Sequence, residues 1–205
     1  MGEAREGKNQ MQKIALFGTS ADPPTMGHQT ILSWLACQFD RVATWVSNNP
    51  FKSHRATLEQ RGAMLQLLIA EIDPPQPNIE WHPELGHPKT LIVVQRARER
   101  WGIEVELTLV IGADLVHQLP NWYQIEHLLR QVKLLIVPRP HYRLQSPDLE
   151  VLKHMGAAIA IAPLVGPTVS STAYREQGDT TAITPKIEAY IRREQLYACQ
   201  NAAPR

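Results

Sequence analysis

A strand-to-helix turn near the start of the chain carries the first residues that could bind a phosphate group. Residues 18–28, with the sequence GTSADPPTMGH, join an apolar run to a helical pattern. A turn that opens a helix presents backbone N–H groups and the positive end of the helix dipole, which together bind anions. Gly27 would let a phosphate approach the backbone closely, while Thr25 and His28 could donate to its oxygens. An ordinary turn with an incidental histidine would have the same spacing, and the segment matches neither G-x-G-x-x-G nor G-x-x-x-x-G-K-[ST].

A second candidate phosphate site lies at residues 169–175, with the sequence VSSTAYR. Ser170, Ser171 and Thr172 are typical of the N-cap and first turn of a helix. Their hydroxyls and the N–H groups of that turn could bind phosphate, and Arg175 follows about one turn later on the same face. Taken alone, these residues are explained better by a helix cap followed by a solvated arginine. Two candidate anion sites in one chain indicate a phosphate-binding protein more specifically than either segment does alone.

Composition and charge limit the classes of protein to which the chain can belong. It has 205 residues, 43% of them hydrophobic, and a net charge of +1, as expected for a globular domain that is not built to grip nucleic acid. The sequence shows no apolar run near the roughly 20 residues of a membrane span and no signal-peptide core. Two cysteines are too few for a disulfide framework and favour a reducing compartment. We therefore expect a cytoplasmic enzyme or binding protein, with a flexible arm at residues 1–10 and one domain over residues 11–200.

Short apolar runs alternate with helical patterns along that domain. Runs typical of strands occupy residues 14–17, 41–47, 78–82, 105–111, 133–137 and 157–162. A first helical pattern begins after Pro24. A second begins at a capping box formed by Thr57 and Gln60 and carries Leu58, Leu65, Leu68, Ile69 and Ile72. Further helical patterns cover residues 90–101, 122–131, 147–155, 171–177 and 185–195. Several strand runs are continuously apolar, so both faces of the sheet should be covered. The order predicts an α/β domain with a doubly wound parallel sheet.

Such a sheet binds its ligand beyond the carboxyl ends of the strands, at the point where the winding direction reverses. Residues 18–28, 48–55, 111–114 and 165–175 would all lie at that edge. By contrast, His82 and His87 lack the spacing of a zinc site with cysteine. The charged residues at 96, 98, 99 and 100 are expected to form a solvated helix face.

Together, the two phosphate segments resemble the signatures (H/T)-x-G-H and I-S-S-T-x-x-R of the nucleotidyltransferase superfamily. Within it, the chain is similar to the nicotinate (nicotinamide) mononucleotide adenylyltransferases from about residue 12 to residue 198. Further matches are Asn49–Lys52, Arg61, Met64, Thr90, Ile111–Asp114, Trp122, Arg139–Pro140 and the ending from Ile183 to Tyr197. The sequence departs from the family in three places. Residues 18–23 lack the second glycine and the phenylalanine of Gly-Gly-(Ser/Thr)-Phe-Asp-Pro, and Thr25 stands where the first motif has histidine, a form also common in pantetheine-phosphate adenylyltransferases. Residues 49–52 read Asn-Pro-Phe-Lys where the family has Pro-Pro-His-Lys.

The resemblance implies a Rossmann-like nucleotidyltransferase fold and transfer of the adenylyl group of ATP to nicotinate mononucleotide, giving deamido-NAD and pyrophosphate in NAD biosynthesis. It implies Mg²⁺ carried by ATP and no metal site on the protein. The implied catalytic contacts are His28, Thr25 and Arg175, and the implied ATP contacts are Gly18, Thr19, Ser20, Gly27, His28, Ser170, Ser171, Thr172 and Arg175. The implied mononucleotide contacts are Lys52, Thr90, Asp114, Trp122 and Tyr123.

Several alternatives stay open at this point. The substrate could be nicotinamide mononucleotide, or the chain could be a sister adenylyltransferase such as one acting on pantetheine phosphate. A nucleotide sensor that kept the fold is the non-enzymatic alternative. ATP and a pyridine mononucleotide are the expected partners, with no nucleic acid and no membrane, and homo-oligomerisation is left open.

Overall fold

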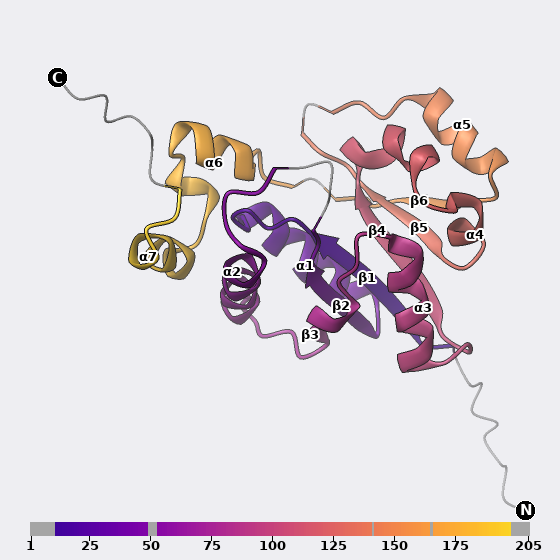
Figure 1. The fold of residues 1–205 in the computed structure, drawn as a ribbon, viewed down its shortest axis with the longest axis horizontal. Coiled ribbons are helices and arrows are strands. Elements are labelled where there is room, and N and C mark those ends of the chain that lie inside the picture. Colours follow the sequence, from indigo (N-terminus) through magenta and orange to yellow (C-terminus); the bar gives the residue numbers. More distant parts are fainter. Residues whose placement is uncertain (1–10, 49–52, 141, 165, 198–205) are drawn as a thin grey trace, which may run out of the picture.

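Six parallel strands form the central sheet of the molecule (Figure 1). The computed structural model describes residues 11–48, 53–140, 142–164 and 166–197. The strands are β1 (Lys13–Thr19), β2 (Arg41–Val46), β3 (Ile79–Trp81), β4 (Glu106–Gly112), β5 (Lys133–Val137) and β6 (Ala158–Ile161). Their order in the sheet is β3-β2-β1-β4-β5-β6, so the chain winds outward from β1 in one direction and then in the other. The predicted doubly wound α/β fold is confirmed.

Strand β1 shows why its sequence is apolar at successive positions. The side chains of Ile14 and Leu16 belong to one hydrophobic core, and those of Ala15 and Phe17 belong to a second core on the other face. All four are buried. Because successive side chains of a strand point to opposite faces, a strand covered on both sides cannot alternate apolar with polar residues.

Helices cover both faces of the sheet. The α-helices are α1 (Met26–Gln38), α2 (Leu58–Ala70), α3 (Thr90–Trp101), α4 (Ile125–Leu129), α5 (Ser146–His154), α6 (Ser171–Gln177) and α7 (Pro185–Arg193). The 3-10 helices are η1 (Pro83–Leu85), η2 (Ala113–Asn121) and η3 (Thr180–Ala182). One core receives side chains from α3, η2 and α4, and the other from α1, α2 and α7. Within the described ranges, no helix combines the length and apolar character needed to cross a bilayer.

One local expectation is wrong. The helix expected over residues 122–131 is only the short α4, because residues 113–121 form a 3-10 helix that contains Pro120 and Trp122 follows it in extended conformation. Leu58, in the first turn of α2, is 52% exposed, since the buried positions of that helix begin only at Arg61. The predicted capping box is confirmed: Thr57 and Gln60 exchange side chain–backbone hydrogen bonds of 3.0 and 3.2 Å.

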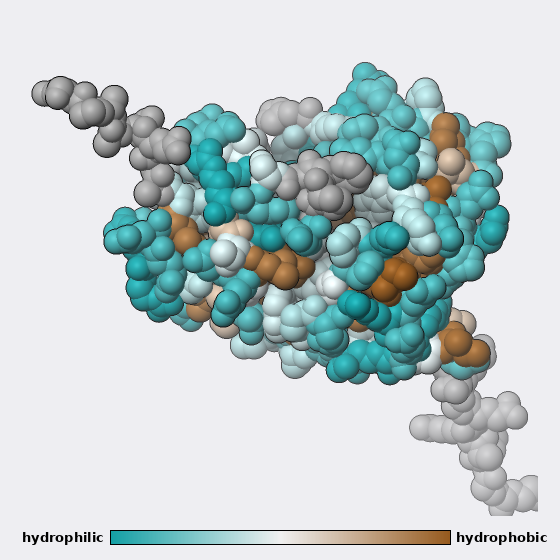
Figure 2. Space-filling model, viewed as in Figure 1, coloured by the Kyte–Doolittle hydropathy of each residue, from teal (hydrophilic) through white to brown (hydrophobic). Residues whose placement is uncertain are grey.

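The surface is mainly hydrophilic in the view of Figure 2, where apolar side chains emerge in small separate patches. Large hydrophobic side chains at the surface include Ile103 and Ile161. Ile161 belongs to β6, an edge strand in which most side chains are exposed. The apolar run at 157–162 is therefore a strand, as predicted, but it is not covered on both faces.

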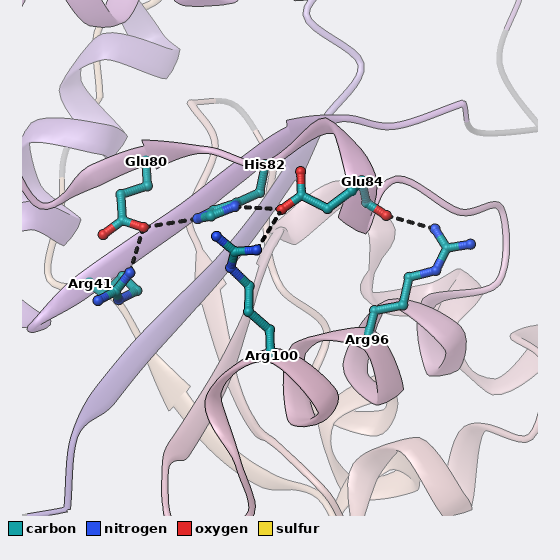
Figure 3. A network of polar contacts seen from close by, with 6 residues as sticks. All are labelled: Arg41, Glu80, His82, Glu84, Arg96 and Arg100. Carbon is teal, nitrogen blue, oxygen red and sulfur yellow. Dashed lines mark hydrogen bonds and ion pairs between the residues drawn. The ribbon is translucent and has the colours of Figure 1, made fainter.

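A chain of ion pairs joins the short edge strand β3 to its neighbours (Figure 3). Glu80 accepts from Arg41 of β2 at 2.6 Å and from Nε2 of His82 at 2.9 Å. Nδ1 of His82 lies 2.8 Å from Glu84, which lies 3.4 Å from Arg100 of α3. Because a carboxylate can only accept, each ring nitrogen of the buried His82 faces a hydrogen-bond acceptor. The network fixes the segment that leads from β3 into α3.

The arginines of α3 correct the expectation of a solvated helix face. Arg96 donates to the carbonyl oxygen of Glu84 at 2.8 Å (Figure 3). It also donates to the carbonyl oxygen of Gly86 at 3.0 Å. Arg98 donates to three carbonyl oxygens, those of Ile103, Val105 and Gln131. Only residues 99 and 100 of the group are exposed. A long stem lets an arginine at the edge of a buried face reach backbone carbonyls in neighbouring loops, which helical periodicity cannot reveal.

We expect His82→Phe to lower the free energy of unfolding by about 1–3 kcal/mol at pH 7, because two carboxylates lose a buried hydrogen-bond partner. Burial alone would raise the pKa of Glu84, but its backbone hydrogen bond, the bond from His82 and the charges of His82 and Arg100 hold it below the ordinary 4.5. The ionised form of Glu84 therefore stabilises the fold above pH 4.5, and this stabilisation is lost as the pH falls through the lowered native value. The difference in the free energy of unfolding between His82→Phe and the wild type should therefore shrink as the pH falls.

Urea unfolding at several pH values between 7 and 4 measures both effects. His127→Phe makes the same substitution at an exposed position of α4 and should change stability by no more than about 0.5 kcal/mol. A pH-independent difference for His82→Phe would mean that the ring acts only by packing.

Candidate active site

A cleft of about 1220 Å³ opens at the carboxyl ends of β1, β4 and β5. Its floor includes the last residues of β1 and of β4, the two strands between which the winding direction reverses. This is the predicted position of the site. Every predicted site residue in the described part of the chain lines the cleft, namely Gly18, Thr19, Ser20, Thr25, Gly27, His28, Thr90, Asp114, Trp122, Tyr123, Ser170, Ser171, Thr172 and Arg175. Lys52 and the rest of residues 49–52 lie outside the described residues.

The first turn of α1 orients the imidazole of His28. Thr25 is the N-cap residue, and its backbone N–H donates to Nδ1 of His28 at 3.0 Å. The hydroxyl of Thr25 lies 2.9 Å from the same nitrogen. Because a backbone N–H can only donate, Nδ1 is an acceptor and the ring proton resides on Nε2. The turn thus presents His28 as a hydrogen-bond donor through Nε2.

Two glycines lie where segments pack together around this turn, and the packing at Gly18 requires glycine. A Cβ at Gly18 would lie 2.6 Å from the indole of Trp45, so the end of β1 tolerates no side chain there. A Cβ at Gly27 would lie 3.4 Å from the hydroxyl of Thr25 and 3.6 Å from Val169. Gly27 therefore lies where the start of α1 meets the segment that precedes α6.

The second phosphate segment packs directly on the first. Ser170 caps α6 by accepting from the N–H of Ala173 at 3.0 Å. Ser171 donates its hydroxyl to the carbonyl of Pro23 at 2.7 Å. Arg175 donates to the carbonyl of Asp22 and, at 3.3 Å, to the hydroxyl of Thr172. The structure therefore brings together two segments that are about 150 residues apart in the sequence.

Asp22 is a buried carboxylate that sequence reasoning did not identify as part of the site. It accepts from the backbone N–H groups of Arg55 and Ala56, at 2.8 and 3.2 Å, and from the hydroxyl of Tyr197 at 2.6 Å. Burial and the bond to Asp22 raise the pKa of Tyr197, which stays protonated and donates. The aspartate that precedes a proline in the turn was the available signal, but its partners come from distant parts of the chain.

Arg61 places a buried guanidinium beneath the same loops. It is 2% exposed and donates to the carbonyls of Ser20, Ser47 and Ala56 at distances of 2.7 to 3.2 Å. Burial lowers the pKa of Arg61, and the nearby charge of Asp22 opposes that effect. An arginine remains charged under these conditions, so the ends of β1 and β2 are joined by a buried cation.

The other part of the cleft is aromatic and carries its own ion pair. Trp122 is half-buried and packs against the core formed with α3 and α4, and Tyr123 beside it is 46% exposed. Asp114, just beyond β4, lies 2.7 Å from Nε of Arg139. The ammonium of Lys89, a residue that sequence reasoning did not select, lies 4.2 Å from the centre of the Tyr123 ring.

Metal-ligating side chains do not gather in this cleft within the described residues, where no three His, Cys, Asp or Glu residues could hold one ion together. Asp114 contributes a carboxylate to the lining, but it is engaged with Arg139. The donors of the cleft are instead backbone N–H groups, hydroxyls, His28 and cationic side chains. This set of donors suits phosphate oxygens better than a bare cation.

Comparison with known proteins is consistent with this geometry. The cytidylyltransferase-like family model matches residues 16–177. A Synechocystis protein named probable nicotinate-nucleotide adenylyltransferase is 41% identical over 197 residues, covering 90% of this chain and 98% of the relative. The nicotinate-nucleotide adenylyltransferase of Bacillus subtilis is 27% identical over 203 residues, covering 91% of this chain and 99% of the relative.

Solved structures share the fold. The Plasmodium falciparum nicotinic acid mononucleotide adenylyltransferase complexed with NaAD superimposes with a TM-score of 0.76 at 18% identity, covering 91% of this chain and 97% of that one. The same Plasmodium enzyme complexed with APC gives a TM-score of 0.71 at 19% identity.

Proposed function

The chain belongs to the cytidylyltransferase-like family, in its nicotinate-nucleotide adenylyltransferase group, and we propose that it transfers the adenylyl group of ATP to nicotinate mononucleotide. The products are deamido-NAD and pyrophosphate, so the reaction belongs to NAD biosynthesis. The observation that carries this proposal is the packing of residues 22–27 against residues 169–175 in a cleft that also contains Trp122. The scarcity of cysteine favours the cytoplasm as its compartment.

The reaction needs positioning more than proton transfer. The phosphate of the mononucleotide is already an anion at pH 7, and one of its oxygens attacks the α-phosphorus of ATP. A new P–O bond forms while the bond from the α-phosphorus to the bridging oxygen breaks, and pyrophosphate leaves with that electron pair. The barrier then depends on alignment of the reactants and on donors that neutralise charge on the phosphates.

His28 is the proposed donor to the α-phosphate. Its Nδ1 is held by Thr25, so Nε2–H is the group that can bond a phosphate oxygen. Thr25 adds a neutral contact. Residues 18–20 and 27 form the part of the cleft where the nucleotide can approach the protein backbone closely. A fixed neutral donor costs little reorganisation as charge develops.

Arg175 and the start of α6 are proposed to hold the β- and γ-phosphates. The guanidinium has five N–H donors and uses only part of them on Asp22 and Thr172. Mg²⁺ is proposed to enter with ATP and would neutralise part of the charge of its phosphates. Ser170, Ser171 and Thr172 complete this half of the site.

The mononucleotide is proposed to occupy the aromatic half. Trp122 would stack on the pyridine ring, and the backbone N–H groups near Thr90 and Tyr123 would receive its carboxylate. Asp114 would accept from a ribose hydroxyl while it keeps its contact with Arg139. Lys52 is proposed to reach the mononucleotide phosphate.

The decisive experiment offers the purified protein ATP and Mg²⁺ with nicotinate mononucleotide, nicotinamide mononucleotide or phosphopantetheine. We expect pyrophosphate release to be fastest with the nicotinate compound, by about tenfold or more in kcat/KM, because a site rich in donors leaves the amide NH₂ unpaired. Preference for phosphopantetheine would assign the chain to the sister reaction. ATP binding without turnover of any acceptor would indicate a nucleotide sensor.

We expect His28→Ala to lower kcat by roughly 10²–10³-fold while the thermal unfolding midpoint changes little, because one donor to the reacting phosphate is lost. Steady-state kinetics and a thermal melt measure the two effects. His154→Ala, at an exposed position of α5, is the matched control and should retain normal turnover. Near-normal turnover of His28→Ala would reduce the histidine to a structural part of the turn.

We expect Arg175→Ala to raise the KM for ATP about tenfold or more and to change the KM for the mononucleotide much less. Arg175→Lys should restore only part of the affinity, because lysine lacks the planar fork of donors. Arg130→Ala removes an exposed arginine of a surface ion pair and serves as the control. Equal loss of affinity for both substrates would contradict the assignment of Arg175 to ATP.

A further inference from the structure

Lys89 places a cation beside the residues proposed to hold the pyridine ring. It is the N-cap residue of α3 and directly precedes Thr90. Its ammonium lies 4.2 Å from the centre of the Tyr123 ring, and Tyr123 is the chain neighbour of Trp122. Lys89, Thr90, Trp122 and Tyr123 all line the cleft. The position of this charge is therefore set by two elements that meet at the mononucleotide half of the site.

The segment that carries Lys89 is held from both sides. The backbone N–H of Lys89 donates to Nδ1 of His87 at 3.0 Å. Arg96, further along α3, donates to the carbonyl of Gly86 at 3.0 Å. The lysine stem thus starts from a fixed backbone, and the Tyr123 ring directs its end. A cation held in this way loses less freedom when it binds a ligand than a lysine on an unsupported loop.

The charge of Lys89 is not neutralised by a protein carboxylate in the described part of the chain. The other cation on this side, Arg139, forms an ion pair with Asp114 at 2.7 Å. The contact of Lys89 is with an aromatic face, which orients an ammonium and leaves its positive charge intact. An anionic group of the ligand is therefore the missing partner that this position would bind.

Resting on the proposed function, we propose that Lys89 is a specificity-determining residue that recognises the ring carboxylate of nicotinate mononucleotide. The mononucleotide has two anionic groups, the phosphate and the ring carboxylate. The phosphate must meet the α-phosphate of ATP near His28, whereas the ring belongs beside Trp122 and Tyr123. An ammonium has three donors and no acceptor, so it bonds a carboxylate strongly and cannot satisfy the NH₂ of the carboxamide.

The test measures kcat/KM for nicotinate and nicotinamide mononucleotides with the full-length protein at saturating ATP. We expect Lys89→Met, which keeps the stem and removes the charge, to lower kcat/KM for the nicotinate compound about tenfold or more and to leave the nicotinamide compound within about threefold. Lys89→Arg should retain most of the selectivity, and the KM for ATP should not change. Lys13→Met, at an exposed position at the amino end of β1, is the matched control.

The possible outcomes separate the two proposals. An equal fall for both mononucleotides would overturn the assignment, since it would place Lys89 on the shared phosphate. Unchanged selectivity would overturn it as well, while turnover by the wild type would leave the proposed function standing. If the wild type adenylylates neither mononucleotide, both proposals fail. Lys89→Gln and a thermal melt of each variant keep the test valid if the methionine variant folds poorly.

Discussion

The geometry of the half of the cleft that is proposed to bind ATP depends on two buried opposite charges, Asp22 and Arg61, which hydrogen-bond to backbone groups of several loops. The carboxylate accepts two backbone N–H groups and a tyrosine hydroxyl, and the guanidinium donates to three carbonyl oxygens. A parallel sheet brings the ends of β1 and β2 to one edge, where the chain turns away from the ladder and leaves such groups without strand partners. Burying those groups is costly unless each finds a partner. Asp22 and Arg61 meet that requirement for the segments around residues 20–23, 47 and 55–56, and Arg175 then binds the carbonyl of Asp22.

Much of the fold is predictable from local sequence because local physics decides it. The run from Ile14 to Phe17 is apolar at successive positions since two helical layers cover β1, and Thr57 with Gln60 satisfies the first N–H groups of α2 within four residues. The pairing of Thr25 with His28 is likewise contained in one helical turn. The two phosphate segments are recognisable for the same reason. Their packing against each other is a long-range contact, which depends on the order of the strands in the sheet.

The features that escaped prediction involve long side chains and distant partners. Arg96 and Arg98 have the spacing of a solvated face, yet their guanidinium groups reach carbonyls in loops that no periodic pattern locates. Lys89 precedes a helix as an ordinary surface lysine would, and only the fold brings Tyr123 beneath it. The 3-10 helix that ends near Trp122 contains Pro120, and the pattern there is too irregular for a prediction of its length.

The bond between Tyr197 and Asp22 joins residues 175 positions apart. Since a ribosome makes the chain in one direction, the loop after β1 must wait for α7 and the residues beyond it before its carboxylate gains this partner. The loop that is proposed to bind phosphate therefore lacks one of its supports in a growing chain, even when β1 and β2 have already paired. Nucleotide affinity should consequently arise late in synthesis, when Tyr197 packs against the loop that follows β1.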